Sequence, residues 1–318
     1  MILLKRLLQN NVVIGESEED PVLCVSDLLI HLAADQMDKK AAKVIEGEAL
    51  DIIVGNMPVK SEDNDKDKNP AKTYILKLLK DKYGIEEEDF MSAELEVVPA
   101  GPARDLGIDR SMILGYGQDD RVCAYTSLVA MLVTENPEKT TVCLLVDKEE
   151  IGSVGATGMQ SHFFENMVAE VLDRMGEYSE LALRRALSNS QMLSSDVNAA
   201  FDPNYASVFE KKNTSFLGRG IVFSKFTGSR GKSGSNDANA EYVAKVRAAL
   251  EADDVAYQMA ELGKVDVGGG GTIAYILANY GMEVIDCGVA VLSMHAPYEA
   301  TSKIDIYEAM RGYLAFLK

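Results

Sequence analysis

The stretch VCLLVDKEEIGS, residues 142–153, sets the expectation for the fold. Val142–Asp147 is an apolar run typical of a buried strand, and it leads directly into Glu149, Glu150 and Gly152. In α/β proteins, functional sites lie at the carboxyl ends of strands. The stretch therefore predicts a buried strand that delivers two adjacent carboxylates to one edge of a sheet.

Similar apolar runs alternate with helical patterns along most of the chain. Further buried strands are expected at Gly220–Phe226 and Glu283–Ser293. Helical spacing of apolar residues is found at Asp119–Val133, Ser161–Met175, Asp237–Ala252 and Ser302–Leu317. This alternation, from about Glu94 onward, predicts an α/β sheet with helices on both faces.

The first part of the chain lacks this regular alternation of apolar runs and helical patterns. The elements expected here are a short strand at Asn11–Gly15, a loop followed by a strand at Gly47–Gly55, an exposed loop at Ser61–Pro70 and a surface helix at Ala71–Tyr83. This change in the sequence pattern predicts two domains, residues 1–93 and 94–318.

Charge and cysteine usage exclude several functions. The chain has 50 acidic and 32 basic residues and a net charge of −18, which argues against nucleic acid or an anionic membrane as partner. The charge keeps a cytoplasmic protein soluble, or some of the carboxylates hold cations. The four cysteines, without a C-x-x-C pair, predict reduced thiols. Met1–Leu8 is too short for a secretory signal, and no apolar run is long enough to span a membrane.

Acidic residues recur at other expected element boundaries. Asp119 and Asp120 lie in GYGQDDRV, where they can cap a helix or bind a metal ion. Asp196 lies in SSDVN, where it can be a turn residue or a ligand. The Glu149–Glu150 pair can likewise be ordinary acids at a helix start. His295 follows a predicted strand, although a lone histidine is more often structural than a ligand.

The glycine run Gly268–Gly271 precedes Thr272 and a helical pattern. It matches neither the dinucleotide fingerprint nor the P-loop, which needs a following lysine. Tight backbone packing near a site explains it better than nucleotide binding. Nucleotide binding is therefore the weakest of the functional hypotheses for this chain.

Taken together, the acidic clusters and the imidazole predict a site for two divalent metal ions. Oxygen ligands combined with imidazole suit zinc, cobalt or manganese. Two such ions about 3.5–4 Å apart can hold a bridging hydroxide and polarise a peptide carbonyl.

Five motifs, in order, carry a family resemblance. They are GQDDRV (117–122), DKEEIGS (147–153), SSDVNAAFDPNY (194–205), DVGGGGTIA (266–274) and SMHAPYE (293–299). The chain resembles the aspartyl aminopeptidase and vacuolar aminopeptidase I family of two-metal exopeptidases, and is nearer to its bacterial branch.

The resemblance implies a role for each matching residue. Asp119 would bridge the two metal ions, Glu150 and His295 would complete one of them, and Asp196 would bind the other. Glu149 would be the general base that takes a proton from the metal-bound water and passes it to the leaving amine. In the substrate region, Lys225 would face the substrate, and Gly270 and Thr272 would shape the floor of the site.

Several positions depart from the family pattern. Asp120 stands where the family has Asn, and Asn198 stands where it often has His. Family members also begin earlier, with a His-x-Asp motif whose histidine shares a metal ion with Asp196. No such motif is found here, and neither His31 nor His162 takes its place. The expectation is a weakened second metal site.

The resemblance also implies an architecture and an activity. The fold would be a three-layer α/β domain with a mixed, mostly parallel sheet and an inserted, β-rich dimerisation domain, residues 1–93. Dimers would build a tetrahedral dodecamer. The activity would be metal-dependent removal of N-terminal residues from peptides, and part of the family prefers acidic ones. Two divalent ions would be needed, with zinc expected first and cobalt or manganese as alternatives. The rival reading is a catalytically incompetent assembly subunit of the same fold.

Overall fold

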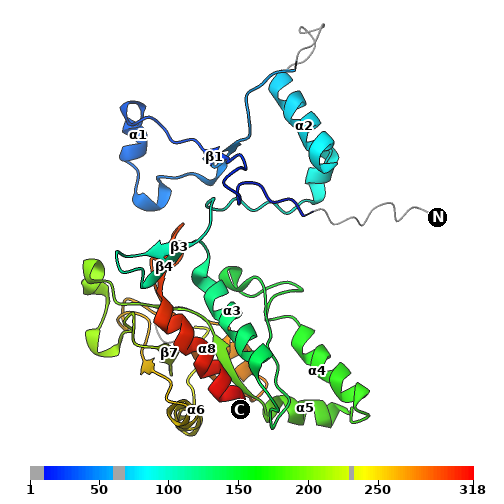
Figure 1. The fold of residues 1–318 in the computed structure, drawn as a ribbon, viewed down its shortest axis with the longest axis vertical. Helices are drawn as coiled ribbons and strands as arrows, with labels where there is room; N and C mark the ends of the chain where they lie inside the picture. The colour runs from blue at the N-terminus through cyan, green and yellow to red at the C-terminus, as the bar shows by residue number, and fades with distance from the viewer. Residues whose placement is uncertain (1–10, 60–68, 229–232) are drawn as a thin grey trace, which may run out of the picture. The chain divides into compact units, whose positions relative to one another are not determined.

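The computed structural model describes residues 11–59, 69–228 and 233–318. The chain divides into two compact units, Met1–Pro102 and Ala103–Lys318 (Figure 1). The sequence analysis placed the division after residue 93, and the dimerisation role of the first part stays a prediction. The segment Met1–Leu8 and most of the loop expected at Ser61–Pro70 lie outside the described residues.

The described residues of the first unit form one small antiparallel ladder, two α-helices and several short 3-10 helices. Its strands and α-helices are β1 (Cys24–Val25), β2 (Ile52–Ile53), α1 (Ala34–Met37) and α2 (Pro70–Tyr83). The predicted helix at Ala71–Tyr83 is confirmed as α2. Its start is fixed because the Asn69 side chain accepts a hydrogen bond from the Lys72 amide, and Gly84 ends it with a φ of +68°.

Two strand predictions for this unit have different outcomes. The strand expected within Gly47–Gly55 is confirmed as β2, whereas Asn11–Gly15 forms no ladder with any described residue. A strand needs a hydrogen-bonded neighbour, which an apolar pattern alone does not supply. In the described residues, the β-rich character expected of this unit is limited to β1 and β2.

Most apolar side chains of the first unit are exposed. Among its described residues only Gly15 and Ala33 are buried. Large exposed apolar residues include Leu29, Ile30, Leu32, Ile45 and Leu95, each more than half accessible. A unit this open has little core of its own, and exposed apolar surface of this kind marks interaction sites.

The second unit is built on two sheets. Its strands are β3 (Arg104–Leu106), β4 (Met112–Gly115), β5 (Gln191–Ser195), β6 (Asn198–Ala199), β7 (Ile221–Ser224), β8 (Tyr257–Met259), β9 (Glu283–Gly288), β10 (Ala290–Leu292) and β11 (Glu299–Ser302). One sheet has the order β3-β4-β11-β10-β6, and the other has the order β5-β9-β7-β8. In the second sheet β5–β9 and β7–β8 are parallel and β7–β9 is antiparallel. The expected mixed α/β class is confirmed.

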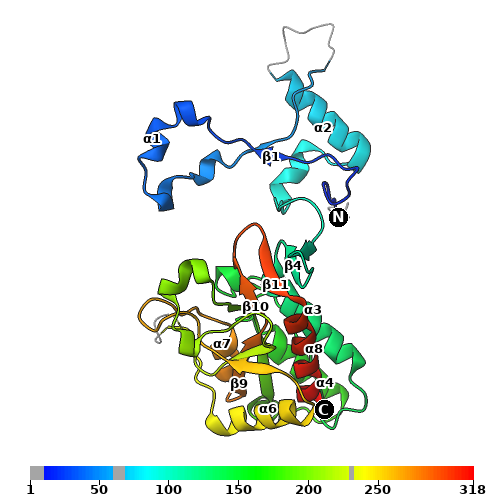
Figure 2. The same cartoon turned by 60° about the vertical axis from the view of Figure 1, so that its left-hand side comes forward.

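Helices cover both faces of the four-stranded sheet (Figure 2). They are α3 (Gln118–Val133), α4 (Phe163–Arg174), α5 (Glu180–Ser188), α6 (Ala240–Ala252), α7 (Ala274–Ala278) and α8 (Lys303–Leu317). The core on one face joins α3, α6 and α8 to Ile285 and Cys287 of β9, and the core on the other joins α4, α5 and α7 to Val284. Because side chains alternate along a strand, β9 serves both cores and the unit has three layers.

Most predicted elements of the second unit are confirmed. The four predicted helices are α3, α4, α6 and α8. The predicted strand at Gly220–Phe226 is β7, and the one at Glu283–Ser293 is divided into β9 and β10, which belong to different sheets. No helix in the described ranges combines the length and the apolar character needed to cross a bilayer.

The strand predicted at Val142–Asp147 is wrong. In the structure this segment joins no ladder. The lining of a groove of about 590 Å³ includes Val142–Val146 and residues of β5. Leu144 and Val146 still pack against the core formed with α4, α5 and α7. Val142 and Leu145 are 46% and 56% exposed, so the run is only partly buried, and it has no neighbour among the described strands to pair with.

Candidate metal centre

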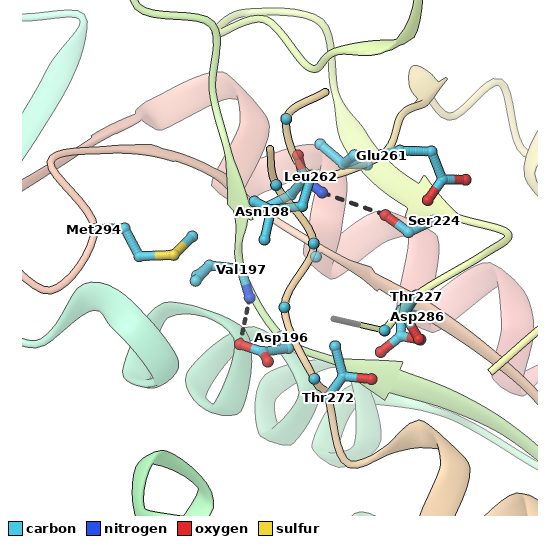
Figure 3. Close-up of a pocket in the computed structure, with 18 of the residues that line it drawn as sticks. Asp196, Val197, Asn198, Ser224, Thr227, Glu261, Leu262, Thr272, Asp286 and Met294 are labelled. Atoms are coloured by element: carbon cyan, nitrogen blue, oxygen red, sulfur yellow. Dashed lines mark hydrogen bonds between the residues drawn. The ribbon is translucent and has the colours of Figure 1, made fainter. Parts of the chain in front are cut away.

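Four segments of the second unit bring acidic side chains and an imidazole to one cavity of about 230 Å³. Its lining includes every residue that the sequence analysis assigned to metal binding or proton transfer: Asp119, Glu149, Glu150, Asp196 and His295. Figure 3 shows part of this lining, with Asp196 and Met294 on one side and Asp286 and Thr227 on the other.

Short turns position these side chains, and those that carry Asp119, Asp196 and His295 follow strands. After β4, Gly117 turns the chain into α3 with a φ of +63°, which places Asp119 in the first helical turn. The 3-10 turn Glu149–Ile151 is enclosed by Lys148 and Gly152, both in the left-handed region. Asp196 directly follows β5, and His295 follows β10 and itself has a φ of +64°. Backbone in such sparsely populated regions is concentrated at functional sites.

The first group of potential ligands is Asp119, Glu150 and His295. The Nε2 atom of His295 lies 3.0 Å from Oδ2 of Asp119 and 3.1 Å from Oε1 of Glu150. One ligand atom from each residue lies within 4.8 Å of the other two. Two carboxylates and an imidazole within this distance form a donor set that suits zinc and related divalent ions.

A second group shares Asp119 with the first. It consists of Asp119, Asp120 and Asp196, whose carboxylate oxygens again lie within 4.8 Å of one another. The sequence analysis considered Asp120 with Asp119 as a helix cap or a metal ligand, but the family resemblance gave a ligand role to Asp119 alone. Its place beside Asp119 was the available signal. With Asp120, the second group offers three oxygen donors.

Burial and mutual repulsion change the protonation of these carboxyls. Burial raises the pKa of Asp119 to about 8, and the neighbouring Asp120, Glu150 and Glu299 carboxylates add to the effect. Burial and the adjacent Asp120 also raise the pKa of Asp196 well above its ordinary value. Carboxyls crowded in this way retain protons at neutral pH unless a cation balances their charge. The arrangement therefore fits a site that divalent cations complete.

Glu149 lines the same cavity but belongs to neither group of potential ligands. Burial raises its pKa to about 7, with further contributions from Asp120 and Glu150. A carboxyl with this pKa exists in both protonation states near neutral pH. It can therefore accept a proton and later return it, as a general base and acid must.

The glycine run forms another wall of the cavity. All of Gly268–Gly271 and the following Thr272 line it. A Cβ atom at Gly268 would lie 2.4 Å from the backbone oxygen of Leu262, so only glycine permits this close approach. The expected packing role of the run is thus visible at this position. By contrast, Lys225 is absent from the described lining, and its ammonium group pairs with Asp237.

Two further carboxyls line the cavity and were not anticipated from the sequence. Asp286, in the middle of β9, is only 5% exposed, and neither of its carboxylate oxygens makes a hydrogen bond of normal geometry with a described residue. Burial raises its pKa to about 6, although the nearby hydroxyls of Thr272, Ser194 and Thr227 oppose the shift. Burial likewise raises the pKa of Glu261 to about 7.

The two remaining histidines are absent from the described cavity lining, whereas Asn198 belongs to it. His162 precedes α4 and lies 2.9 Å from Glu165, and His31 belongs to the first unit. Asn198 lines the cavity and is held by two hydroxyls, since Ser215 donates to its Oδ1 at 2.7 Å and its Nδ2 donates to Ser224 at 3.3 Å. It is therefore a fixed polar part of the wall.

Comparisons with known proteins identify a matching family and similar proteins. The model of the family described as aminopeptidase I zinc metalloprotease (M18) matches residues 1–317. A probable M18 family aminopeptidase 1 of Clostridium acetobutylicum is 64% identical over 307 residues, which cover 96% of this chain and 65% of the relative. The chain thus spans slightly less than two thirds of that protein's length.

Solved structures extend the likeness to the fold. The crystal structure of aminopeptidase I from C. acetobutylicum has a TM-score of 0.89 and 62% identity, and the match covers 97% of this chain and 66% of that one. A dodecamer of mApe1 from S. cerevisiae matches at 22% identity with a TM-score of 0.61, covering 85% of this chain and 60% of that one.

Proposed function

Because this chain belongs to the M18 family of aminopeptidase I zinc metalloproteases, we propose that it acts as a metal-dependent aminopeptidase, removing N-terminal residues from peptides. One observation carries the proposal. Two groups of three potential ligands share Asp119 in a single cavity, and Glu149 lines that same cavity. A nucleotide-binding protein would not need this concentration of carboxylates.

The two metal ions would be held by different sets of ligands that share one residue. Asp119, Glu150 and His295 would hold one ion, and Asp119, Asp120 and Asp196 would hold the other. When bound, such ions would polarise the carbonyl of the scissile bond and make a water molecule more acidic. The imidazole and carboxylate donors suit zinc, with cobalt and manganese as alternatives. Asp120 would give the second ion a third oxygen ligand.

Glu149 would move the proton. With a pKa of about 7, its carboxylate can take a proton from the attacking water as the new C–O bond forms. The same carboxyl can then protonate the leaving amine as the C–N bond breaks. The substrate gains the elements of water, and Glu149 ends in its starting state.

The substrate would lie against the wall opposite the metal ligands. Gly270 and Thr272 line the cavity and would contact the N-terminal residue. Lys225 would act from outside the described lining. A preference for acidic residues has little support, since Asp286 and Glu261 also line the cavity and His295 is the only basic side chain among the described lining residues.

A metal-reconstitution assay tests the proposal. The protein is stripped with a chelator, supplied with Zn²⁺, Co²⁺ or Mn²⁺, and assayed with aminoacyl-nitroanilides. Turnover that depends on the metal, with about two ions bound per chain, supports the peptidase. No turnover with any metal contradicts it, and one ion or none per chain would favour the rival reading of an assembly subunit.

We further propose that the chain assembles as a homo-oligomer through its first unit. The exposed apolar side chains of that unit support this, and the S. cerevisiae relative is a dodecamer. Dimers building a tetrahedral dodecamer are the specific form that the family resemblance suggests, and the cytoplasm is the proposed location. Light scattering coupled to size-exclusion chromatography gives the assembled mass, and a monomeric mass at micromolar concentration would contradict the oligomer.

A further inference from the structure

Glu299 connects two of the potential metal ligands through their backbones. Its carboxylate accepts a hydrogen bond from the Asp119 amide at 3.0 Å and another from the His295 amide at 2.8 Å. Each bond uses a different carboxylate oxygen. The residue is only 2% exposed and belongs to neither group of ligands. One buried side chain thus joins segments that are far apart in the sequence.

Both of these amides belong to backbone that ordinary secondary structure does not hold. His295 has a φ of +64°, and Asp119 has a ψ of 111° within the first turn of α3. A non-glycine residue in the left-handed region is unfavourable unless its surroundings fix it there. The Glu299 carboxylate supplies such a fixed partner for each N–H group.

Glu299 is itself held in a rigid frame. It is the first residue of β11, and β11 pairs with β4 on one side and with β10 on the other. The Gln118 side chain donates to the backbone oxygen of Glu299 at 2.5 Å and to that of Ile113 at 3.2 Å. Thr301 in turn donates to Oε1 of Gln118. A carboxylate on a central strand with this support can set the position of the loops that it contacts.

We propose that Glu299 is a positioning residue for the metal centre, holding the Asp119 and His295 backbones so that both side chains present their ligand atoms to one ion. The inference rests on the proposed metal-dependent function. Residues that orient metal ligands without touching the metal change its affinity by about 10- to 100-fold when they are replaced.

The test compares two buried carboxylates that make the same kind of contact. In Glu299→Gln, the side-chain amide keeps one acceptor oxygen, so one of the two backbone bonds is lost without a change of shape. Asp305→Asn is the matched control. Asp305 is fully buried and accepts hydrogen bonds from the Gly218 and Gly220 amides, both at 2.7 Å, but it is absent from the ligand groups and from the described cavity lining.

Two readouts are used. Competition of Zn²⁺ with a chromogenic chelator is expected to show one ion bound about 10- to 100-fold more weakly in Glu299→Gln, with affinity unchanged in Asp305→Asn. Hydrogen exchange in the metal-free proteins is expected to show protected Asp119 and His295 amides in the wild type, and reduced protection at one or both in Glu299→Gln only.

Two results would overturn the positioning role: wild-type zinc affinity in Glu299→Gln, or rapid exchange of both amides in the wild-type protein. Equal loss of affinity in both variants would show a general structural effect and would also overturn it. If the wild-type protein binds no metal, the proposed function fails instead. Hydrogen exchange then still decides whether Glu299 holds the two backbones.

Discussion

The imidazole Nε2 of His295 lies 3.0 Å from Oδ2 of Asp119, although His295 follows β10 and Asp119 lies in the first turn of α3. The Asp119 side chain is 6% exposed, whereas that of His295 is 60% exposed. The carboxylate is therefore a fixed, buried partner, and the imidazole closes the site from its open side. Their different environments give different expectations for their removal.

Replacing Asp119 should affect both metal ions, and replacing His295 should affect one. In Asp119→Ala, both groups lose a ligand, so metal counting by mass spectrometry after dialysis should find little metal in the protein. His295→Ala should retain one ion, with the other weakened by more than the roughly 100-fold typical of residues that only orient a ligand. His162→Ala is the control, because His162 contacts Glu165 at the surface. Identical metal contents for the two ligand variants would contradict the shared role of Asp119.

The neighbouring glutamates should respond differently to the same chemical change. Glu149→Gln removes the proton acceptor but no ligand, so turnover should fall about 10²- to 10⁴-fold while the metal content stays unchanged. Glu150→Gln should instead lower the metal content. Steady-state kinetics and metal analysis on the same samples separate these outcomes. Unchanged turnover in Glu149→Gln would remove this residue from the mechanism.

The cavity should disfavour acidic N-terminal residues. Like charges brought together inside a protein cost several kcal/mol, and about 1.4 kcal/mol is already a tenfold change. We expect kcat/KM for a leucyl substrate to exceed that for an aspartyl substrate by about 10-fold or more. Asp286→Asn and Glu261→Gln should narrow the gap. Faster cleavage of the aspartyl substrate by the wild-type protein would contradict this view of the cavity.

The metal-free protein should lose stability as the pH rises. Burial raises the pKa of Glu261 from its ordinary value of 4.5 to about 7, so the folded state binds more protons than the unfolded state between these values. This contribution is fully present below about pH 4.5 and is lost as the pH rises through about 7. Urea unfolding in the presence of a chelator should show a smaller decline from pH 5 to pH 8 in Glu261→Gln than in the wild type. An equal decline in both proteins would argue against a buried, protonated Glu261.

Local patterns predicted the helices of the second unit well. The apolar spacing in α3, α4, α6 and α8 reports which face is buried, and burial against the sheet is what forms those helices. The strand predicted at Val142–Asp147 is wrong for a different reason. A strand depends on a pairing partner elsewhere in the chain, and an apolar run carries no information about that partner.

The candidate site likewise contains residues that the sequence predicted and residues that it could not predict. Asp119, Glu149, Glu150, Asp196 and His295 could be selected because each lies at a predicted element boundary, and all five line one cavity. Asp286 could not, since it is a single polar residue within the apolar run of β9. Glu299 was part of a quoted motif, but its role depends on two backbone amides whose positions only the folded chain defines.

The sharing of Asp119 between two ligand groups has a consequence for how ions would load. With a pKa of about 8, this carboxyl must release its proton to solvent when the first ion binds, and it is then already ionised for the second. The first ion also adds positive charge next to the second position. Occupancy of the two positions would therefore be interdependent, and a calorimetric titration at pH 7 should show unequal proton release in its two steps.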